Sequence, residues 1–152
     1  MMFFPNFREK SFDRWLERAT GGQWVSDRRY LYFSPWREEP KSIELTTHFE
    51  VVKLEYGKFS VDWRGQTNGR MVLTLEGAVL HRDIGYFSND PTDSFLERLD
   101  HNTVSFWTTY GGQSYREEVR YLGDDLRLRQ TVGWKEGTDQ MVLAGQYVER
   151  RI

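Results

Sequence analysis

The sequence contains no cysteine, and this absence removes several kinds of chemistry at once. Disulfide bonds, thiolate nucleophiles and cysteine-ligated metal sites are all excluded. The three histidines, His48, His81 and His101, are isolated from one another and lack the closely spaced partner of a typical metal site, so we expect no bound metal. No serine lies in a nucleophile motif, and no glycine-rich phosphate loop occurs. The pattern therefore indicates neither a hydrolase nor a redox enzyme.

The sequence also lacks a long apolar run and a dominant charge. No stretch approaches the ~20 apolar residues that cross a bilayer. In the opening MMFFPNFREK the apolar run is too short for a signal peptide and charge follows at once. The net charge is −2 with acids and bases mixed, which argues against a nucleic-acid binder with a broad basic surface. We therefore expect a soluble cytoplasmic protein that neither binds nucleic acid nor inserts into membranes.

The sequence is rich in aromatic side chains and comparatively poor in aliphatic ones. Six Trp, eight Tyr and ten Phe make up 16% of the 152 residues. Such rings can form the walls of a ligand pocket, because they are large and rigid. They are also ordinary strand formers and core fillers. Composition alone leaves both interpretations open.

Periodicity divides the chain into one helix and a series of strands. An apolar repeat of 3.6 residues predicts a helix over about residues 6–19, with Asn6 as its N-cap and Gly21 and Gly22 after its end. Alternating segments then predict strands at 23–33, 42–55, 59–63, 70–75, 78–87, 103–110, 114–122, 126–134 and 140–149. Between 88 and 100 the alternation breaks, and the spacing of Phe95, Leu96 and Leu99 suggests a short helical turn.

The short turns decide the expected architecture. Turns of two to four residues favour antiparallel neighbours in a meander. We therefore expect an all-β fold, with residues 1–152 as one domain. Its form is an up-and-down antiparallel barrel of about ten strands, of the lipocalin or fatty-acid-binding kind, with an N-terminal helix. The competing interpretation is a β-sandwich.

Two arginines stand out in the segment YREEVRYLGDDLRLRQTVGW, residues 115–134. Arg127 and Arg129 are two residues apart in an expected strand, so their side chains share one face. Leu126 and Leu128 then face the other way, either outward or under the N-terminal helix. Guanidinium groups bind carboxylates in a two-point fork, so this pair on a concave sheet suits a doubly carboxylated ligand. The alternative is a structural ladder of salt bridges.

Carboxylates in the expected strands allow a second kind of contact. Asp62 precedes Trp63, and Glu117 and Glu118 stand in the strand before the arginines. A buried carboxylate can accept N–H donors of a ligand, or it can pair with an arginine across the sheet. The sequence leaves these two roles open.

Several segments together resemble a known family. They are GGQWVSDRRYLYF at 21–33, VDWRG at 61–65, GRMVL at 69–73, LHRDIGYFSNDP at 80–91, the arginine segment at 115–134 and LAGQYVERRI at 143–152. In this order, and across nearly the whole chain, they are similar to the S-type phycobiliprotein lyases, the bilin lyases of the CpcS/CpeS type. Each segment alone would be weak, but the combination is specific.

The resemblance implies a fold and a function. Members use a lipocalin-like barrel, bind phycocyanobilin or phycoerythrobilin, and attach it through a thioether to a cysteine of an apo-phycobiliprotein subunit. The bilin is a substrate, and no permanently bound cofactor is expected. The implied partners are the bilin, the apo-subunit, and a second copy or a related lyase chain, close to phycobilisomes. Two alternatives stay open: a non-enzymatic carrier of bilin or another hydrophobic ligand, and an interaction protein whose aromatic residues are all core.

The resemblance also implies site residues. Arg127 and Arg129 match the family's functional arginines, and Trp63 matches its cavity tryptophan. Arg28, Glu118 and Trp134 are further candidates for the same pocket. On this basis, catalytic roles are expected for Arg127, Arg129 and Glu118. Bilin binding is expected for Trp63, Arg28, Trp134 and the two arginines.

Overall fold

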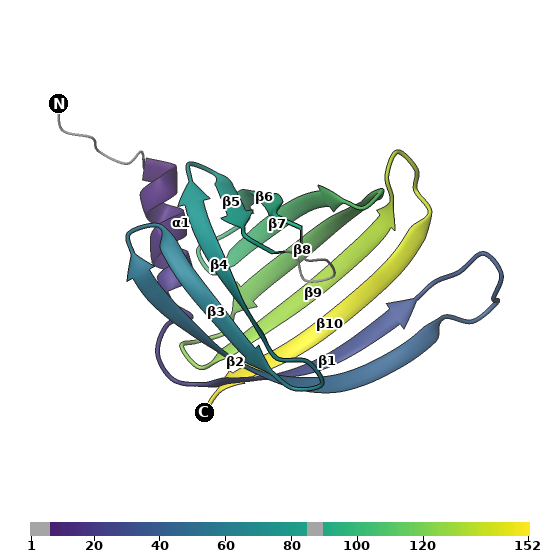
Figure 1. Cartoon of the computed structure of the whole chain (residues 1–152), viewed down its shortest axis with the longest axis horizontal. Helices are drawn as coiled ribbons and strands as arrows, with labels where there is room; N and C mark the ends of the chain where they lie inside the picture. Colours follow the sequence, from purple (N-terminus) through teal and green to yellow (C-terminus); the bar gives the residue numbers. More distant parts are fainter. Residues whose placement is uncertain (1–6, 85–89) are drawn as a thin grey trace.

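A computed structural model of the chain describes residues 7–84 and 90–152. Ten antiparallel strands close into a barrel, and one helix lies at one end of it (Figure 1). The elements are α1 (Phe7–Glu17), β1 (Trp24–Tyr32), β2 (Lys41–Glu55), β3 (Lys58–Arg64), β4 (Gly69–Glu76), β5 (Val79–Arg82), β6 (Thr92–Arg98), β7 (Thr103–Tyr110), β8 (Gln113–Tyr121), β9 (Leu126–Lys135) and β10 (Met141–Arg151). Each strand pairs with its neighbours in the sequence, and β1 pairs with β10 to close the barrel.

The expected up-and-down barrel with an N-terminal helix is confirmed, and the sandwich is excluded. The expected helical turn around Phe95 is wrong, because Thr92–Arg98 forms strand β6 between β5 and β7. Its inward face carries the small hydroxyls of Thr92 and Ser94, while Phe95 points outward and is 63% exposed. Because polar side chains face inward here and an aromatic one faces outward, the sequence does not show the apolar alternation that is typical of a strand. Asn6 and the expected strand end at 85–87 lie outside the described residues.

Strand β1 shows how the sequence sets the two faces of the barrel wall. Trp24, Ser26 and Tyr30 are buried on the inward face, and Asp27 and Arg29 are exposed on the outward face. This two-residue period repeats around the barrel, because successive side chains of a strand point to opposite sides. The strand expected at 23–33 is confirmed as β1.

Helix α1 closes one end of the barrel. Phe12, Trp15, Leu16 and Ala19 are buried in the same cluster as the inward side chains of the strands. The indole N–H of Trp15 donates to the carbonyl of Asn102 at 3.1 Å, which ties the helix to the turn between β6 and β7. Burial of each large apolar side chain stabilises the fold by roughly 1.5–3 kcal/mol. The helix is therefore an integral part of the core.

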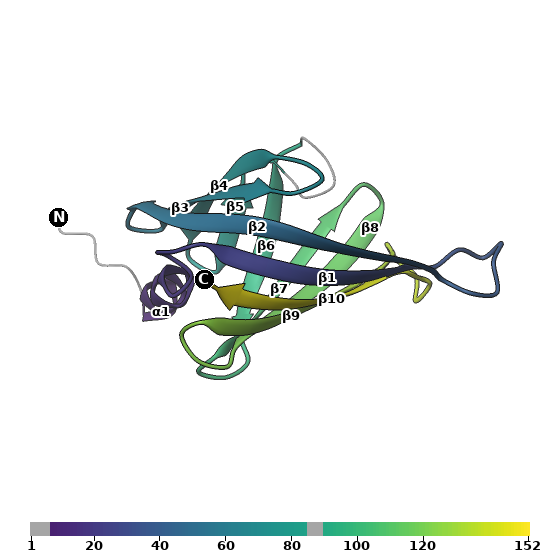
Figure 2. The same cartoon turned by 90° about the horizontal axis from the view of Figure 1, so that it is seen from below.

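The other end of the barrel is open. There the hairpin of β1 and β2 extends past the remaining strands, and its loop projects from the body of the molecule (Figures 1 and 2). The two strands stay paired as far as Tyr32 and Lys41. Within the described parts of the chain, no helix is long and apolar enough to cross a membrane.

Candidate functional site

A cavity of about 360 Å³ lies inside the barrel, between helix α1 and the open end. Inward-facing side chains of the strands form its wall, and Trp15, Leu16 and Ala19 of the helical segment form part of its floor. Most of the wall is aromatic or aliphatic, and a few charged side chains interrupt it. A cavity of this kind, apolar with a few placed polar groups, is typical of a small-molecule site.

A buried network of charges lies on the inner face of the neighbouring strands β8, β9 and β10. Arg127 Nε donates to Glu149 Oε1 at 2.7 Å, and Arg129 Nη1 donates to Glu149 Oε2 at 3.2 Å. Arg129 Nη2 also donates to Glu117 Oε1 at 2.9 Å. Strands β8, β9 and β10 are neighbours, so the register of the sheet brings these four side chains together. Arg127, Arg129 and Glu149 are all buried, with Glu149 fully enclosed.

The network keeps Arg127 and Glu149 charged. Burial alone would raise the pKa of the Glu149 carboxyl, but Arg127 and Arg129 outweigh it and hold that pKa at about 2, below the ordinary value of 4.5. Burial also disfavours the Arg127 cation, yet the Glu149 carboxylate outweighs it and raises the pKa of Arg127. At neutral pH a carboxylate is therefore fixed between two guanidinium groups, directly behind the wall of the cavity.

Arg127 lies in a box of aromatic rings at the helix end of the cavity. Its guanidinium carbon is 5.2 Å from the ring centre of Trp24, 5.1 Å from Phe49 and 5.8 Å from Tyr121. Cation–π contacts at such distances hold a cation where water is excluded. Arg127 Nη1 also donates to the Tyr121 hydroxyl at 3.2 Å. The side chain is thus fixed before any ligand arrives.

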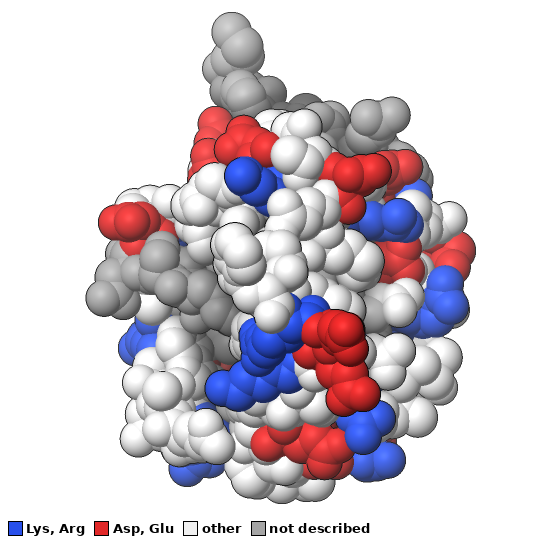
Figure 3. All heavy atoms as spheres, turned by 90° about the vertical axis from the view of Figure 1, so that its right-hand side faces the viewer, with Lys and Arg blue, Asp and Glu red and all other residues white. Residues whose placement is uncertain are grey.

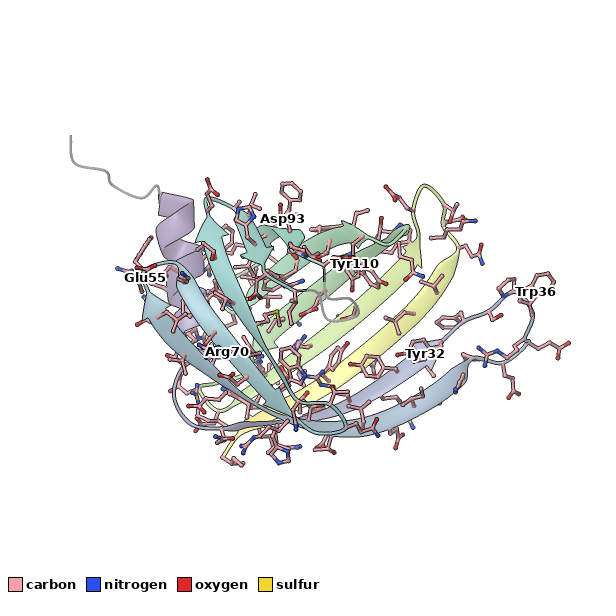
Figure 4. All side chains as sticks on the ribbon, viewed as in Figure 1. Tyr32, Trp36, Glu55, Arg70, Asp93 and Tyr110 are labelled. Atoms are coloured by element: carbon pink, nitrogen blue, oxygen red, sulfur yellow. The ribbon has the colours of Figure 1, made fainter. Side chains whose placement is uncertain are left out.

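Tyrosines surround the open end of the cavity. Tyr30 and Tyr147 meet edge to face at 5.4 Å, and Tyr110 and Tyr115 stack at 5.0 Å. Burial, together with the neighbouring Tyr30, raises the pKa of the Tyr147 phenol, and burial with Tyr115 raises the pKa of Tyr110. These phenols stay protonated at neutral pH. They offer flat apolar faces and O–H groups to a ligand at the end of the cavity where Figure 4 labels Tyr32 and Tyr110.

Glycines within the strands make room for these rings. A Cβ at Gly145 would lie 2.9 Å from the Tyr147 hydroxyl, and a Cβ at Gly133 would lie 2.9 Å from Tyr115 Cε1. At Gly69 the conflict is larger, because a Cβ would lie 2.2 Å from Cζ2 of Trp63. The Trp63 ring therefore rests directly on the backbone of β4. Glycine is required at this position for the ring to line the cavity as it does.

The formal charge of the cavity is positive. Among the described residues, the charged side chains that line the cavity are Arg28, Arg82, Arg127, Arg129 and Glu117, and Glu149 lies fully buried behind this lining, paired with Arg127 and Arg129. Four positive and two negative charges leave a net formal charge of +2. A buried excess of positive charge is costly unless an anion offsets it. The interior therefore suits a ligand with two negative charges.

The structure brings four of the expected site residues together. Arg28, Trp63, Arg127 and Arg129 all line the interior cavity. Arg28 Nε donates to Ser26 Oγ at 3.0 Å, and its guanidinium carbon is 5.2 Å from the centre of the Tyr147 ring. Leu128 faces outward and is 40% exposed, so the first of the two expected arrangements for the leucines is confirmed for this residue.

Glu118 and Trp134 lie elsewhere, on the outer face of the barrel. Glu118 accepts hydrogen bonds from Arg116 and from Gln130, the latter at 3.1 Å. Trp134 packs edge to face on Trp107 at 6.3 Å. Neither lines the cavity, because both occupy positions of β8 and β9 whose side chains alternate away from it.

Sequence reasoning missed Glu149 as a site residue and chose Glu118 where Glu117 faces the cavity. A signal was present in both cases. In β8, Tyr115, Val119 and Tyr121 share the face of Glu117, so the apolar alternation identifies the inward carboxylate. In the closing segment, Tyr147 and Glu149 are two apart and share a face in the same way.

A second hollow, of about 770 Å³, is lined mostly by outward-facing side chains of β8, β9, β10, β1 and β2, and it shares Arg28, Leu45, Arg129 and Tyr147 with the interior cavity. Charged side chains there pair with each other across the strands, as Arg29 and Glu44 do at 2.8 Å, and most are exposed to solvent. Exposed pairs of this kind contribute little and attract ligands weakly. The interior cavity is smaller, but its charges are buried and preorganised, so it is the better candidate site.

The sequence is similar to a described family and to named relatives. The family model described as CpeS-like protein matches residues 64–152. A Nostoc sp. protein named "Putative phycocyanobilin lyase CpcS 2" is 26% identical over 156 residues, which cover 86% of this chain and 86% of the relative. A Picosynechococcus sp. protein named "Putative chromophore lyase CpcV" is 28% identical over 89 residues, which cover 59% of this chain and 43% of that relative.

Solved structures share the fold. The S-type phycobiliprotein lyase CPES from Guillardia theta superposes with a TM-score of 0.70 at 16% identity, over 97% of this chain and 98% of that one. A Nostoc punctiforme protein of unknown function from the DUF3598 family superposes with a TM-score of 0.65 at 14% identity, over 90% of this chain and 48% of that one. These likenesses support the barrel, and the family model covers more than half of the sequence. The chain belongs to the CpeS-like protein family.

Proposed function

We propose that this chain is a bilin lyase. It binds a linear tetrapyrrole, phycocyanobilin or phycoerythrobilin, and attaches it through a thioether to a cysteine of an apo-phycobiliprotein subunit, with residues 1–152 acting as one unit. The observation that carries the proposal is the buried Arg127–Glu149–Arg129 network inside an aromatic cavity of net formal charge +2. Relatives named as lyases of phycocyanobilin and of a chromophore support it.

The chemistry of a bilin matches the cavity group by group. Its conjugated body is flat and apolar, which suits Tyr30, Trp63 and Tyr147. Its two propionates offset the charge of +2. Among the described contacts, two of the five N–H donors of Arg127 go to Glu149 and Tyr121, so this guanidinium keeps N–H capacity for a ligand carboxylate. The pyrrole N–H groups can donate to Glu117, which lines the cavity beside Arg129.

The size of the cavity bears on where the reaction takes place. Its volume of about 360 Å³ is near the lower end of the roughly 300–1,000 Å³ of pockets that enclose drug-sized ligands. A linear tetrapyrrole exceeds such a ligand, so part of it extends through the open end. We place the ring with the ethylidene group there, because a protein thiol has to reach it. The propionates then lie deeper, toward Arg127 and Arg129.

The attachment itself is an addition. The sulfur of the acceptor cysteine bonds to the ethylidene carbon, and the thiol proton ends on the ring carbon of the same double bond, so nothing leaves. The chain contributes position and charge: it fixes the bilin in one conformation, excludes water and offers the Glu117 carboxylate to the pyrrole N–H groups. It has no cysteine of its own that could trap the bilin, so the acceptor supplies the thiol.

The decisive experiment mixes the purified protein with phycocyanobilin and, in parallel, with phycoerythrobilin. An apo-phycobiliprotein subunit is then added. Absorption and fluorescence report binding, and a denaturing gel reports covalent attachment. We expect a spectral shift on binding, followed by attachment at one cysteine. This attachment should be faster than in a mixture of the apo-subunit and free bilin without the protein. Binding without faster attachment would leave a carrier of bilins, and no spectral change with either bilin would refute the proposal.

A further inference from the structure

We propose that the loop between β1 and β2, with Trp36 at its tip, docks onto the protein that supplies the acceptor thiol. This inference rests on the proposed function. It adds a surface of the enzyme that is separate from the bilin cavity, since Trp36 does not line that cavity. The partner is identified by its chemistry: a folded protein that carries the acceptor cysteine beside an apolar recess able to hold an indole.

Trp36 is exposed to an unusual degree. Its exposed fraction of 90% is the highest among the large hydrophobic side chains of the described residues. An indole held in water gives up the favourable free energy of burial. Tryptophan is also the residue type most enriched among side chains that dominate binding at protein interfaces. A single exposed tryptophan at the end of a projecting hairpin therefore has the properties of an interface anchor.

The loop presents this ring in an ordered conformation. The Arg37 amide donates to the Ser34 carbonyl at 3.2 Å, which closes a four-residue turn with Pro35 at its second position. The Trp36 amide donates to Ser34 Oγ, also at 3.2 Å. Proline fixes the backbone at residue 35 and again at residue 40. Because the loop is already ordered, little conformational entropy is lost when the ring is buried against a partner.

The position of the loop points to the acceptor as its partner. Helix α1 closes one end of the barrel, so among the described residues the opposite end is the one from which a thiol can approach the cavity. The β1–β2 loop projects beyond that end, with Trp36 at its far tip (Figures 2 and 4). A protein that approaches the open end meets this tip before it meets the rim of the cavity. Contact there orients the acceptor relative to the protruding part of the bilin.

Charge on this side of the molecule is mixed. Arg37 and Lys41 flank Glu38 and Glu39 in the sequence, and all four are exposed. Figure 3, which faces this side, shows blue and red side chains interspersed with a largely uncharged surface. Among the described residues on this side, charges of one sign do not dominate, so none of them forms a field that would steer a strongly charged ligand. The apolar ring is thus the main source of affinity in the loop, which favours a protein recess over a nucleic acid or a charged membrane.

The first test compares Trp36→Ala with Phe95→Ala. Phe95 is the matched control, because it is 63% exposed on the outer face of β6, away from the loop. Binding of each lyase variant to a bilin-free apo-phycobiliprotein subunit is measured by calorimetry, and binding of phycocyanobilin is measured by absorption. For Trp36→Ala we expect acceptor affinity to fall about 30-fold, the loss typical of an interface anchor. Bilin affinity stays unchanged in both variants, and Phe95→Ala binds the acceptor normally.

A second test uses the absence of cysteine from the chain. The substitution Glu38→Cys introduces a single thiol next to Trp36, which is then labelled with a maleimide photocrosslinker, and Phe95→Cys serves as the control. We expect a crosslink to the apo-subunit from position 38 and none from position 95. This readout does not depend on catalysis, and it leaves Trp36 in place.

The outcomes separate the possibilities. Equal acceptor affinity in Trp36→Ala and the unsubstituted protein, or no measurable acceptor binding by either, overturns the inference. Altered bilin affinity in Trp36→Ala would make the ring a cover for the cavity instead. Loss of self-association in that variant, measured by sedimentation, would make the partner a second copy of this chain. If the unsubstituted protein binds the acceptor through Trp36 but binds no bilin, the docking surface stands and the proposed function fails.

Discussion

Glu149 on β10 accepts a 2.7 Å hydrogen bond from Arg127 on β9, and the two residues are directly opposite each other in the sheet. Both side chains are buried. Each charge is acceptable inside the barrel only because the other is present, since a lone buried ion is strongly destabilising. The same pair that prepares the cavity for a ligand is therefore also a condition for folding.

Removal of the carboxylate should destabilise the protein. In Glu149→Gln, Arg127 and Arg129 lose a shared buried counter-charge, and we expect the free energy of unfolding to fall by about 3–5 kcal/mol. Urea unfolding followed by tryptophan fluorescence measures it. The control is Glu44→Gln. The Glu44 carboxylate is exposed and pairs with Arg29 at the surface, so its removal should lower the free energy of unfolding by no more than about 1 kcal/mol. A loss below 1 kcal/mol in Glu149→Gln would contradict this account.

The same carboxylate predicts how stability depends on pH. The pKa of Glu149 is held at about 2 in the folded protein, below the ordinary 4.5, so the unfolded chain binds this proton more readily. Its contribution is complete above about pH 4.5 and is lost as the pH falls toward 2, by up to roughly 3 kcal/mol. The free energy of unfolding, measured from pH 7 to pH 3, should show this decline. In Glu149→Gln the part of the decline that is due to Glu149 should be absent. Identical slopes in the two proteins would rule out Glu149 as the source.

The fold was largely predictable because periodicity and turns are local properties. Nine of the strands and the helix follow from alternation, from a 3.6-residue repeat and from glycines at turns. Strand β6 was not predictable in this way. Its inward positions include Ser94, which hydrogen-bonds to Thr108 on the neighbouring strand β7, and its outward positions include Phe95. That pairing is a long-range property, and no local pattern encodes it.

The candidate site was predictable only in part. The spacing of Arg127 and Arg129 placed both on one face, but it did not say which partners they would meet. Glu149 becomes their partner because β9 pairs with β10 in one particular register. Glu117 and Glu118 are adjacent in the sequence and point to opposite sides of the wall, so the choice between them depends on which face of β8 is inside. The register and the facing are settled by the closed barrel.

The arginine pair predicts a dependence on the ligand's carboxylates. Arg129→Lys keeps the positive charge but loses the two-point geometry of guanidinium. We expect phycocyanobilin affinity to fall about 10- to 100-fold, the loss typical of a hydrogen bond to a charged group. The dimethyl ester of the same bilin should bind weakly and equally to both proteins, as absorption titrations can show.

Arg29→Lys is the matched control for the arginine pair. Arg29 is exposed on the outer face of β1, where it pairs with Glu44, so bilin affinity should not change. If the ester binds the unsubstituted protein as tightly as the free acid does, the propionates do not contact the arginines. The placement of the bilin proposed above would then be wrong.

The contact of Trp63 with Gly69 predicts a coupled pair of substitutions. Gly69→Ala places a methyl group 2.2 Å from the present position of Trp63 Cζ2, so the ring must move. We expect the free energy of unfolding to fall by about 1–3 kcal/mol and bilin affinity to fall with it. Trp63→Ala removes the clash, so Gly69→Ala should cost little stability in that background. Additive losses in the double variant would show that the methyl group acts on something other than the indole.

The contacts of Arg151 indicate that it helps to hold helix α1 at the end of the barrel. Its guanidinium donates to the carbonyls of Arg18 at 2.6 Å and Thr20 at 2.8 Å, and so joins the end of β10 to the segment after the helix. Arg151→Ala leaves these carbonyls without their charged donor. We therefore expect the free energy of unfolding to fall by roughly 1.5–3 kcal/mol and the backbone amides of residues 11–20 to exchange hydrogen faster. Arg150→Ala is the control, because Arg150 is exposed and only reaches Asp27 at 3.5 Å. If both variants exchange alike, the helix is held by its apolar face alone, and the floor of the cavity does not depend on Arg151.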